Sequence, residues 1–193
     1  MSRMNELYKK MIAFYKEDPG HIQHFVKVHS FARLIAEEEN LDERTRYIVE
    51  AAALVHDIGI KPAIEKYGKD DGPLQEKEGP ALAEEMMSQL GFARDVIARV
   101  SYLVGHHHSY TKIDGIDYQI LVEADFLVNY YENGSEKETI QKSVEKIFRT
   151  ETGKHIAKEM FFPEEFRMSD TWAQDGLQDL EDFIESQGIY IRQ

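Results

Sequence analysis

The sequence predicts an all-α fold. Proline is scarce, with 5 among 193 residues, so long helices can form without interruption. Apolar residues recur at helical spacing along most of the chain, and no segment shows the alternation that is typical of strands. The length suffices for one domain with a sizeable core. We therefore expect one compact helical domain over residues 1–193, with its motifs at about 20–132 and a C-terminal helical extension at about 133–193.

Local signals place the ends of the predicted helices. The first helix ends at the DPG sequence of residues 18–20, where proline and glycine interrupt the periodicity. The third begins near Asp42 and ends before Gly59, in agreement with the residues preferred at helix termini. The glycines and prolines of residues 60–77 indicate a long irregular connection. We expect helices at about 2–17, 20–39, 42–58, 80–90, 93–108, 116–132, 136–149, 152–160 and 173–187.

The composition excludes several classes of site and partner. The chain has 36 acidic and 23 basic residues, a net charge of −13, which repels the backbone of duplex nucleic acid. It has no cysteine, which excludes disulfides and thiolate metal sites and fits a reducing cytoplasm. No apolar run approaches the roughly 20 residues of a membrane span, and the charged N-terminus is unlike a signal peptide. We expect a cytoplasmic protein without a membrane partner. The composition is compatible with a small phosphorylated ligand and with a homo-oligomer.

Histidines and aspartates stand on or near the apolar faces of several predicted helices. His24 points with the apolar stripe of its helix, and Asp125 shares a face with apolar residues of another. His56 and Asp57 close an apolar run, and the histidines of residues 106–108 close one more. Taken alone, each has an ordinary explanation, such as a core histidine bonded to a carbonyl or an aspartate paired with an arginine. Taken together, one divalent cation would offset the carboxylates and accept neutral imidazoles as ligands.

Four motifs carry a resemblance to a known family. They are HFVKVHSFA at residues 24–32, ALVHDIGIK at 53–61, LVGHHH at 103–108 and LVEADFLVN at 121–129. In order, spacing and apolar context they resemble the motifs of the HD-domain superfamily of metal-dependent phosphohydrolases. The resemblance implies a divalent transition metal such as Mn, Fe, Co, Ni or Zn, which imidazole and carboxylate bind. The implied ligands are His24, His56, Asp57 and Asp125, with His106 and His107 added by similarity to the members that bind two metals.

The resemblance also implies a reaction, the hydrolysis of a small phosphate ester by a metal-activated water. The substrate would be a nucleotide or a related metabolite. Asp57 would both bind the ion and orient the water, and Lys61 is the nearest cation for the transition state. The alternative for Lys61 is an exposed lysine in a loop. His108 would donate to the substrate or support a ligand, or else lie on the surface.

The chain departs from the family's pattern in three places. The histidine that two-metal members carry between the His-Asp and His-His pairs is missing from LQEKEGPALAEEM at residues 74–86. A carboxylate could replace it and favour a harder second ion such as Mg or Mn. Glu78 and then Gln75 are the candidates, although Glu78 could instead serve a helix N-terminus. The lysine that commonly follows His-Asp is displaced by one position, to Lys61, and the GYP signature of cyclic-di-GMP phosphodiesterases is absent.

Two other functional classes stay open at this point. A di-iron oxygenase on an HD-type fold would need a full set of histidine ligands, and the missing intermediate histidine argues against it. A non-catalytic ligand-binding sensor would be expected to lose metal ligands, whereas the set of His, His-Asp and Asp is intact here.

Overall fold

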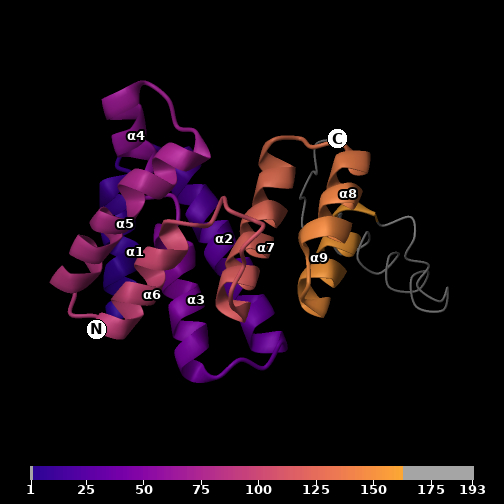
Figure 1. Ribbon diagram of the computed structural model, residues 1–193, viewed down its shortest axis with the longest axis horizontal. Coiled ribbons are helices and arrows are strands. Elements are labelled where there is room, and N and C mark those ends of the chain that lie inside the picture. Colours follow the sequence, from indigo (N-terminus) through magenta and orange to yellow (C-terminus); the bar gives the residue numbers. More distant parts are fainter. Residues whose placement is uncertain (1, 163–193) are drawn as a thin grey trace, which may run out of the picture.

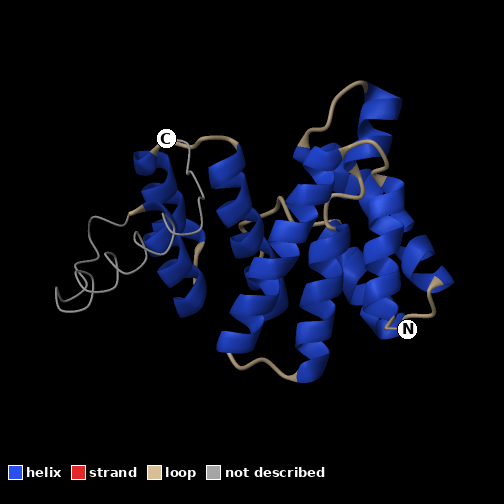
Figure 2. Ribbon diagram, turned by 180° about the vertical axis from the view of Figure 1, so that it is seen from behind, coloured by secondary structure: helices blue, strands red, loops and turns tan. Residues whose placement is uncertain are grey.

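The computed structural model describes residues 2–162, and within that range the regular structure is entirely helical (Figures 1 and 2). The all-α prediction is therefore confirmed. The helix expected at 173–187 lies outside the described residues. The elements are α1 (Arg3–Phe14), α2 (Pro19–Glu38), α3 (Glu43–Val55), α4 (Ile60–Tyr67), α5 (Gly72–Gln89), α6 (Arg94–Val104), α7 (Ile116–Glu132), α8 (Lys137–Ile147) and α9 (Glu151–Phe161).

The centre of the fold is a layer formed by α2, α3 and α7. Helix α2 packs against both α3 and α7, α5 packs against α6, and α8 and α9 form a pair beside α7 (Figure 1). The residues 51–55 of α3, AAALV, are fully buried, and their small alanines allow neighbouring helices to approach closely. Helix α7 is buried on nearly all sides, and its buried residues include the polar Asp117, Gln119, Glu123 and Asp125 as well as apolar ones. Within residues 2–162, no helix is both long and apolar enough to cross a bilayer.

The prediction of a long irregular connection at residues 60–77 is wrong. Helix α4 begins directly at Ile60, and α5 begins at Gly72, well before the expected start at residue 80. The prolines were misleading because Pro62 and Pro73 lie in the first turns of these helices, where no backbone N–H is needed. Only the short link around Gly68, which ends α4 in the left-handed conformation, is irregular.

Two glycines permit the close contacts that bring separate helices together. A Cβ atom on Gly59 would collide with the backbone carbonyl of Gln75 in α5. A Cβ atom on Gly79 would lie 2.6 Å from Cγ1 of Val104, at the end of α6. The turn after α3, the middle of α5 and the end of α6 therefore meet with no room for side chains between them.

A buried carboxylate attaches the α8–α9 pair to the centre of the fold. Glu123 of α7 has no exposed surface, and it accepts hydrogen bonds from Gln119 Nε2 at 2.7 Å and from the backbone N–H of Arg149 at 2.6 Å. The backbone N–H of Thr150, at 3.0 Å, and the Thr150 hydroxyl also donate to it. Thr150 is the N-cap of α9, so Glu123 fixes the point at which that helix begins.

We expect Glu123→Ala to destabilise the protein by about 3 kcal/mol or more, because it leaves several buried donors without an acceptor. Glu123→Gln keeps one acceptor oxygen and should lower the free energy of unfolding by a smaller amount. Chemical denaturation followed by circular dichroism measures both, with the exposed Glu136→Gln as the control. A loss below about 1 kcal/mol for Glu123→Ala would contradict this role of the carboxylate.

Candidate metal centre

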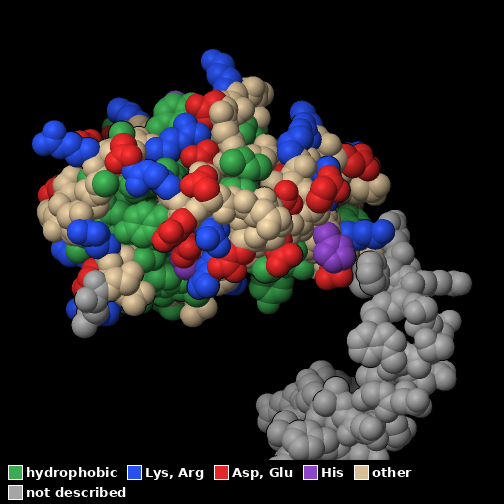
Figure 3. All heavy atoms as spheres, turned by 90° about the horizontal axis from the view of Figure 1, so that it is seen from below, with side chains coloured by type: hydrophobic (Ala, Val, Ile, Leu, Met, Phe, Trp, Pro, Cys, Tyr) green, Lys and Arg blue, Asp and Glu red, His purple; other side chains and the backbone are tan. Residues whose placement is uncertain are grey.

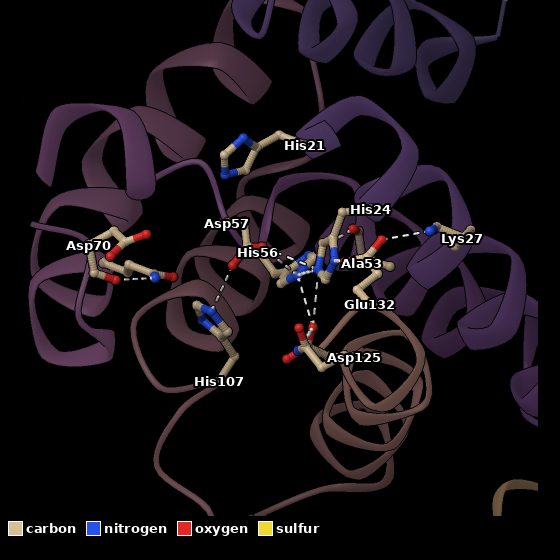
Figure 4. Close-up of polar contacts among 12 residues, drawn as sticks. His21, His24, Lys27, Ala53, His56, Asp57, Asp70, His107, Asp125 and Glu132 are labelled. Carbon is tan, nitrogen blue, oxygen red and sulfur yellow. Dashed lines mark hydrogen bonds and ion pairs between the residues drawn. The ribbon is translucent and has the colours of Figure 1, made fainter. Parts of the chain in front are cut away.

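Three elements meet at the side chains that the sequence analysis singled out. His24 lies on α2, Asp125 lies on α7, and His56 and Asp57 lie in the turn between α3 and α4 (Figure 4). Helix α3 ends at Val55, earlier than expected, so the His-Asp pair occupies a turn rather than the last turn of a helix. In this turn the two side chains point to a common centre.

The ligand-type atoms converge within hydrogen-bonding distance of one another. Nε2 of His24 is 3.3 Å from Nε2 of His56, 3.2 Å from Oδ1 of Asp125 and 3.3 Å from Oδ2 of Asp57. Nε2 of His56 is 3.2 Å from the same Asp57 oxygen. All four side chains are buried or nearly so. The structure thus brings these four residues together.

Hydrogen bonds behind the rings determine which nitrogen faces the centre. Nδ1 of His24 donates to Oε2 of Glu132 at 2.8 Å, and Nδ1 of His56 donates to the carbonyl of Ala53 at 2.9 Å. In the neutral rings both Nε2 atoms then carry lone pairs, and these face each other beside two carboxylates. The two lone pairs and the two carboxylates repel one another unless a cation lies between them. Histidine ligands of metals are typically oriented in this way by a carboxylate or a carbonyl.

A second group shares Asp57 with the first. Asp57, His107 and His108 offer ligand atoms that all lie within 4.8 Å of one another. Nδ1 of His107 donates to the carbonyl of Val104 at 2.9 Å, and its buried Nε2 has no hydrogen bond to the described residues. That Nε2 is 3.4 Å from Oδ1 of Asp57, whose other oxygen faces His24 and His56. The Asp57 carboxylate therefore lies between the two groups.

The charges of these groups compensate one another in the absence of an ion. Burial disfavours the charged form of His24 and of His56, but hydrogen bonds and charges from Asp125 and Asp57 outweigh it and raise both pKa values. Burial likewise opposes ionisation of the two aspartates, but the histidines hold the pKa of each well below its usual range. The carboxylates thus require positive charge, which a proton or a metal ion can supply.

The second group contains a ring that stays neutral. Burial, and then the charge on His107, lower the pKa of His108 to about 4. Oε1 of Gln75 accepts a hydrogen bond from Nε2 of His108 at 2.9 Å, which leaves Nδ1 as the acceptor of the ring. Glu76 accepts from the backbone N–H of His108 at 3.0 Å and from the hydroxyl of Ser109. Gln75, expected as a substitute ligand, therefore holds the ring of His108 at Nε2, while the Tyr110 hydroxyl lies 3.3 Å from Nδ1.

The structure does not bring His106 to the cluster, and the expectation that it joins His107 is wrong. Helix α6 ends at Val104 rather than at residue 108, so the three histidines form a turn in which the rings of His107 and His108 lie together, with centroids 4.0 Å apart, and that of His106 points elsewhere. The ring of His106 is exposed and stacks on Tyr102, with centroids 4.1 Å apart. Its Nδ1 donates to the carbonyl of Tyr102 at 2.7 Å. The neighbouring ring of His108 points inward instead.

Glu78 and Lys61 also lie away from the cluster. Glu78 accepts a hydrogen bond from Tyr67 Oη at 2.8 Å and pairs with Lys66, so it links α5 to α4. Because α5 begins at Gly72, Glu78 is not at a helix N-terminus either. Nζ of Lys61 donates to the carbonyl of Phe14 at 3.3 Å and lies over the ring of that residue. Neither side chain takes the position that the sequence analysis gave it.

Supporting residues on α7 escaped the sequence analysis. Nδ2 of Asn129 donates to Oδ1 of Asp125 at 2.8 Å, and Glu132 holds His24 while pairing with Lys27 at 2.6 Å. Asp125, Asn129 and Glu132 are four and then three residues apart, so they share one face of the helix. The spacing of these polar residues from Asp125 along one face is the signal that could have identified them.

The cluster opens into a cavity of about 440 Å³, whose lining includes His24, Asp57, Asp70, Asn129 and Glu132. The side chains suit one or two divalent cations, as the donor set and the unpartnered Nε2 of His107 both indicate. Imidazole and carboxylate donors are those that first-row transition metals accept, and each ring is held by an outer hydrogen bond. The arrangement can therefore place a cation at the floor of an accessible cavity.

The chain is similar to known proteins in sequence and in fold. The family model of the HD domain matches residues 22–149. A predicted HD superfamily hydrolase from an uncultured Thermotogales bacterium is 24% identical, with a TM-score of 0.60 over 95% of this chain and 92% of that one. YpgQ from Bacillus subtilis is 16% identical, with a TM-score of 0.58 over 84% of this chain and 91% of that one. No match to a curated protein was found. Because the family model covers more than half of the sequence and the metal-ligand motifs meet in space, the chain belongs to the HD domain family.

Proposed function

We propose that the protein is a metal-dependent phosphohydrolase that acts on a small phosphate ester, such as a nucleotide or a related metabolite. The observation that carries the proposal is the convergence of imidazole and carboxylate atoms at the floor of the cavity. Membership of the HD domain family supports it, and so does the likeness to a protein described as a predicted HD superfamily hydrolase.

The proposed ligands fall into two sets that share Asp57. His24, His56, Asp57 and Asp125 would hold a first ion of Mn, Fe, Co, Ni or Zn. His107 and His108, with Asp57, would hold a second. Because this second set offers imidazoles rather than Glu78, it suits a transition metal better than the Mg that an oxygen-rich set would favour. When bound, the ions would polarise a phosphoryl oxygen and lower the pKa of a bound water.

The protein's own groups would orient the reactants. Asp57 borders both sets and the cavity, so its carboxylate can accept a hydrogen bond from the attacking water and fix its direction. Tyr15 donates to the backbone carbonyl of Asp57 at 2.6 Å, and Asn129 donates to Asp125. These bonds hold both carboxylates in place while the substrate binds, which limits the reorganisation that the reaction requires.

The charges around the cavity favour a small substrate. Asp18, Asp70 and Glu132 contribute to its lining, and the whole chain carries a net charge of −13. On the face shown in Figure 3, acidic and basic side chains are interspersed, without a continuous basic stripe. A long polyanion would meet repulsion over its length, whereas a single phosphate would meet mainly the bound ions.

The position of Asp57 between two ligand sets also suits a second candidate, a di-iron oxygenase, because bridged irons require a shared carboxylate. Oxygen consumption distinguishes the two functions. A phosphohydrolase releases phosphate equally well with and without oxygen.

The first prediction concerns metal content. Asp57→Ala should remove nearly all bound transition metal, since it deletes the shared ligand. Glu132→Ala should weaken metal affinity by about 10- to 100-fold, because it frees the ring of His24. Elemental analysis measures the content, with Asp70→Ala as the control from the same cavity. Full occupancy in Asp57→Ala would refute the ligand assignment.

The second prediction separates the histidines of the 106–108 turn. Metal titration of the chelator-treated protein by calorimetry should show two unequal steps. His108→Gln should remove the weaker step, while the matched His106→Gln should leave both steps in place, because His106 faces Tyr102. The opposite result would restore His106 as the ligand.

The third prediction concerns activity. The Mn-, Co- or Ni-loaded protein should release phosphate or a nucleoside phosphate from at least one small ester in a nucleotide screen, and a chelator should abolish the release. Asp57→Ala should lower the rate by at least about 100-fold. Oxygen consumption without phosphate release would favour the oxygenase instead.

A further inference from the structure

An aspartate and a histidine form a pair at the start of α2, outside the metal centre. Asp18 is the N-cap of the helix, and its Oδ1 accepts a hydrogen bond from the backbone N–H of His21 at 3.1 Å. Its Oδ2 lies 2.6 Å from Nδ1 of the His21 ring. The backbone hydrogen bond lowers the pKa of Asp18, which keeps it a carboxylate. Nδ1 of His21 therefore donates to Asp18, and Nε2 points away from it.

His21 borders the cavity of the metal centre without joining the cluster. It lies three residues before His24, so the two side chains emerge from the same side of α2. Figure 4 shows its ring outside the network of contacts that joins His24, His56 and Asp57. Among the described residues that line this cavity there is no lysine or arginine. Apart from the ligand His24, His21 is therefore the nitrogen acid of this lining, whose other titratable side chains are carboxyl groups.

A second cavity begins on the other side of His21. Its volume is about 280 Å³, and it shares Asp18, His21 and Ile60 with the lining of the first cavity. Its remaining walls include the apolar Ile64, two lysines and two glutamates, which are Lys16, Lys61, Glu17 and Glu65. His21 thus lies between the cavity of the metal centre, whose lining has carboxylates and no lysine or arginine, and a second cavity whose lining mixes apolar, acidic and basic side chains.

Tyr15 fixes this ring relative to the metal centre. The rings of Tyr15 and His21 are stacked, with centroids 4.9 Å apart and planes 8° apart. The same Tyr15 donates its hydroxyl to the backbone carbonyl of Asp57 at 2.6 Å. One buried side chain therefore contacts both the histidine and the backbone of the shared ligand, which sets their relative position.

We infer that His21, oriented by Asp18, is the proton donor to the leaving group of the phosphate ester, and that the leaving group occupies the second cavity. This inference deepens the proposed function and rests on it. A phosphate over the metal centre would direct its leaving group past His21 if the rest of the substrate extends between the two cavities. Asp18 would hold the required tautomer and stabilise the imidazolium.

The oxygen of water forms a new bond to phosphorus, and the bond from phosphorus to the leaving oxygen breaks with its electron pair on that oxygen. The leaving oxygen takes the proton from Nε2 of His21, and the product departs as an alcohol. The proton lost by the water passes to solvent, and neutral His21 regains a proton from solvent. No oxidant or reductant takes part.

The test compares two esters that differ in how much their leaving groups need a proton. The Mn-loaded protein is assayed with phenyl phosphate and with p-nitrophenyl phosphate, whose leaving group is a weaker base. His21→Gln should lower kcat for phenyl phosphate by about 100-fold or more and for p-nitrophenyl phosphate by no more than about threefold. Asp18→Asn preserves a good N-cap but removes the charge, so it should show the same selectivity to a smaller degree. The exposed His155→Gln is the matched control.

Metal content and circular dichroism, measured on each variant, provide readouts that do not depend on activity, and both should equal those of the unchanged protein. Equal losses for the two esters, or none, would overturn the role of His21 while leaving the phosphohydrolase intact. A loss of metal in His21→Gln would likewise overturn it. Failure of the unchanged protein to hydrolyse either ester or any nucleotide would overturn the proposed function and this inference together.

Discussion

The mutual repulsion of two imidazole lone pairs and two buried carboxylates is the constraint around which the structure is organised. The Nε2 atoms of His24 and His56 face each other across 3.3 Å because their Nδ1 atoms are occupied by Glu132 and by a carbonyl. Burying such a group without compensation would cost several kcal/mol. A proton can compensate in part, as the raised pKa values of both histidines show. A divalent cation compensates more completely, since it satisfies both rings and both aspartates at once.

This constraint explains why the surrounding packing is so tight. The centre depends on two helices and two turns that hold their positions, since a small displacement would separate the ligand atoms. Gly59 and Gly79 let α5 contact the His-Asp turn and the end of α6 directly, so the second ligand set comes within reach of Asp57. Polar groups that orient the ligands lie on these same helices, since Asn129 of α7 bonds to Asp125 of α7 and Glu132 of α7 bonds to His24 of α2. Rigid elements thus carry both the ligands and the groups that orient them.

The sequence predicted the parts of this arrangement that depend on periodicity, and failed where local backbone geometry decides. The helical class and the positions of His24 and Asp125 followed from residues on apolar faces. The prolines of α4 and α5 were misread because a proline that begins a helix and one that ends it look alike in composition. His106 was expected as a ligand because the LVGHHH motif resembles that of the two-metal family members, whereas α6 ends at Val104 and the histidines follow in a turn. Which ring of a turn points inward depends on dihedral angles that a motif does not specify.

The distribution of charge links substrate binding to metal binding. In the part of the chain that the structure describes, the cavity of the metal centre is lined by carboxylates and by no lysine or arginine. Lys27, which lies nearby, is already paired with Glu132 at 2.6 Å. An anionic substrate would therefore meet a negative potential in the metal-free protein and a reduced or reversed one once divalent cations are bound. The ions would then attract the anionic substrate as well as activate the water. Because the positive potential would be confined to the floor of the cavity, small substrates would be favoured over long polyanions.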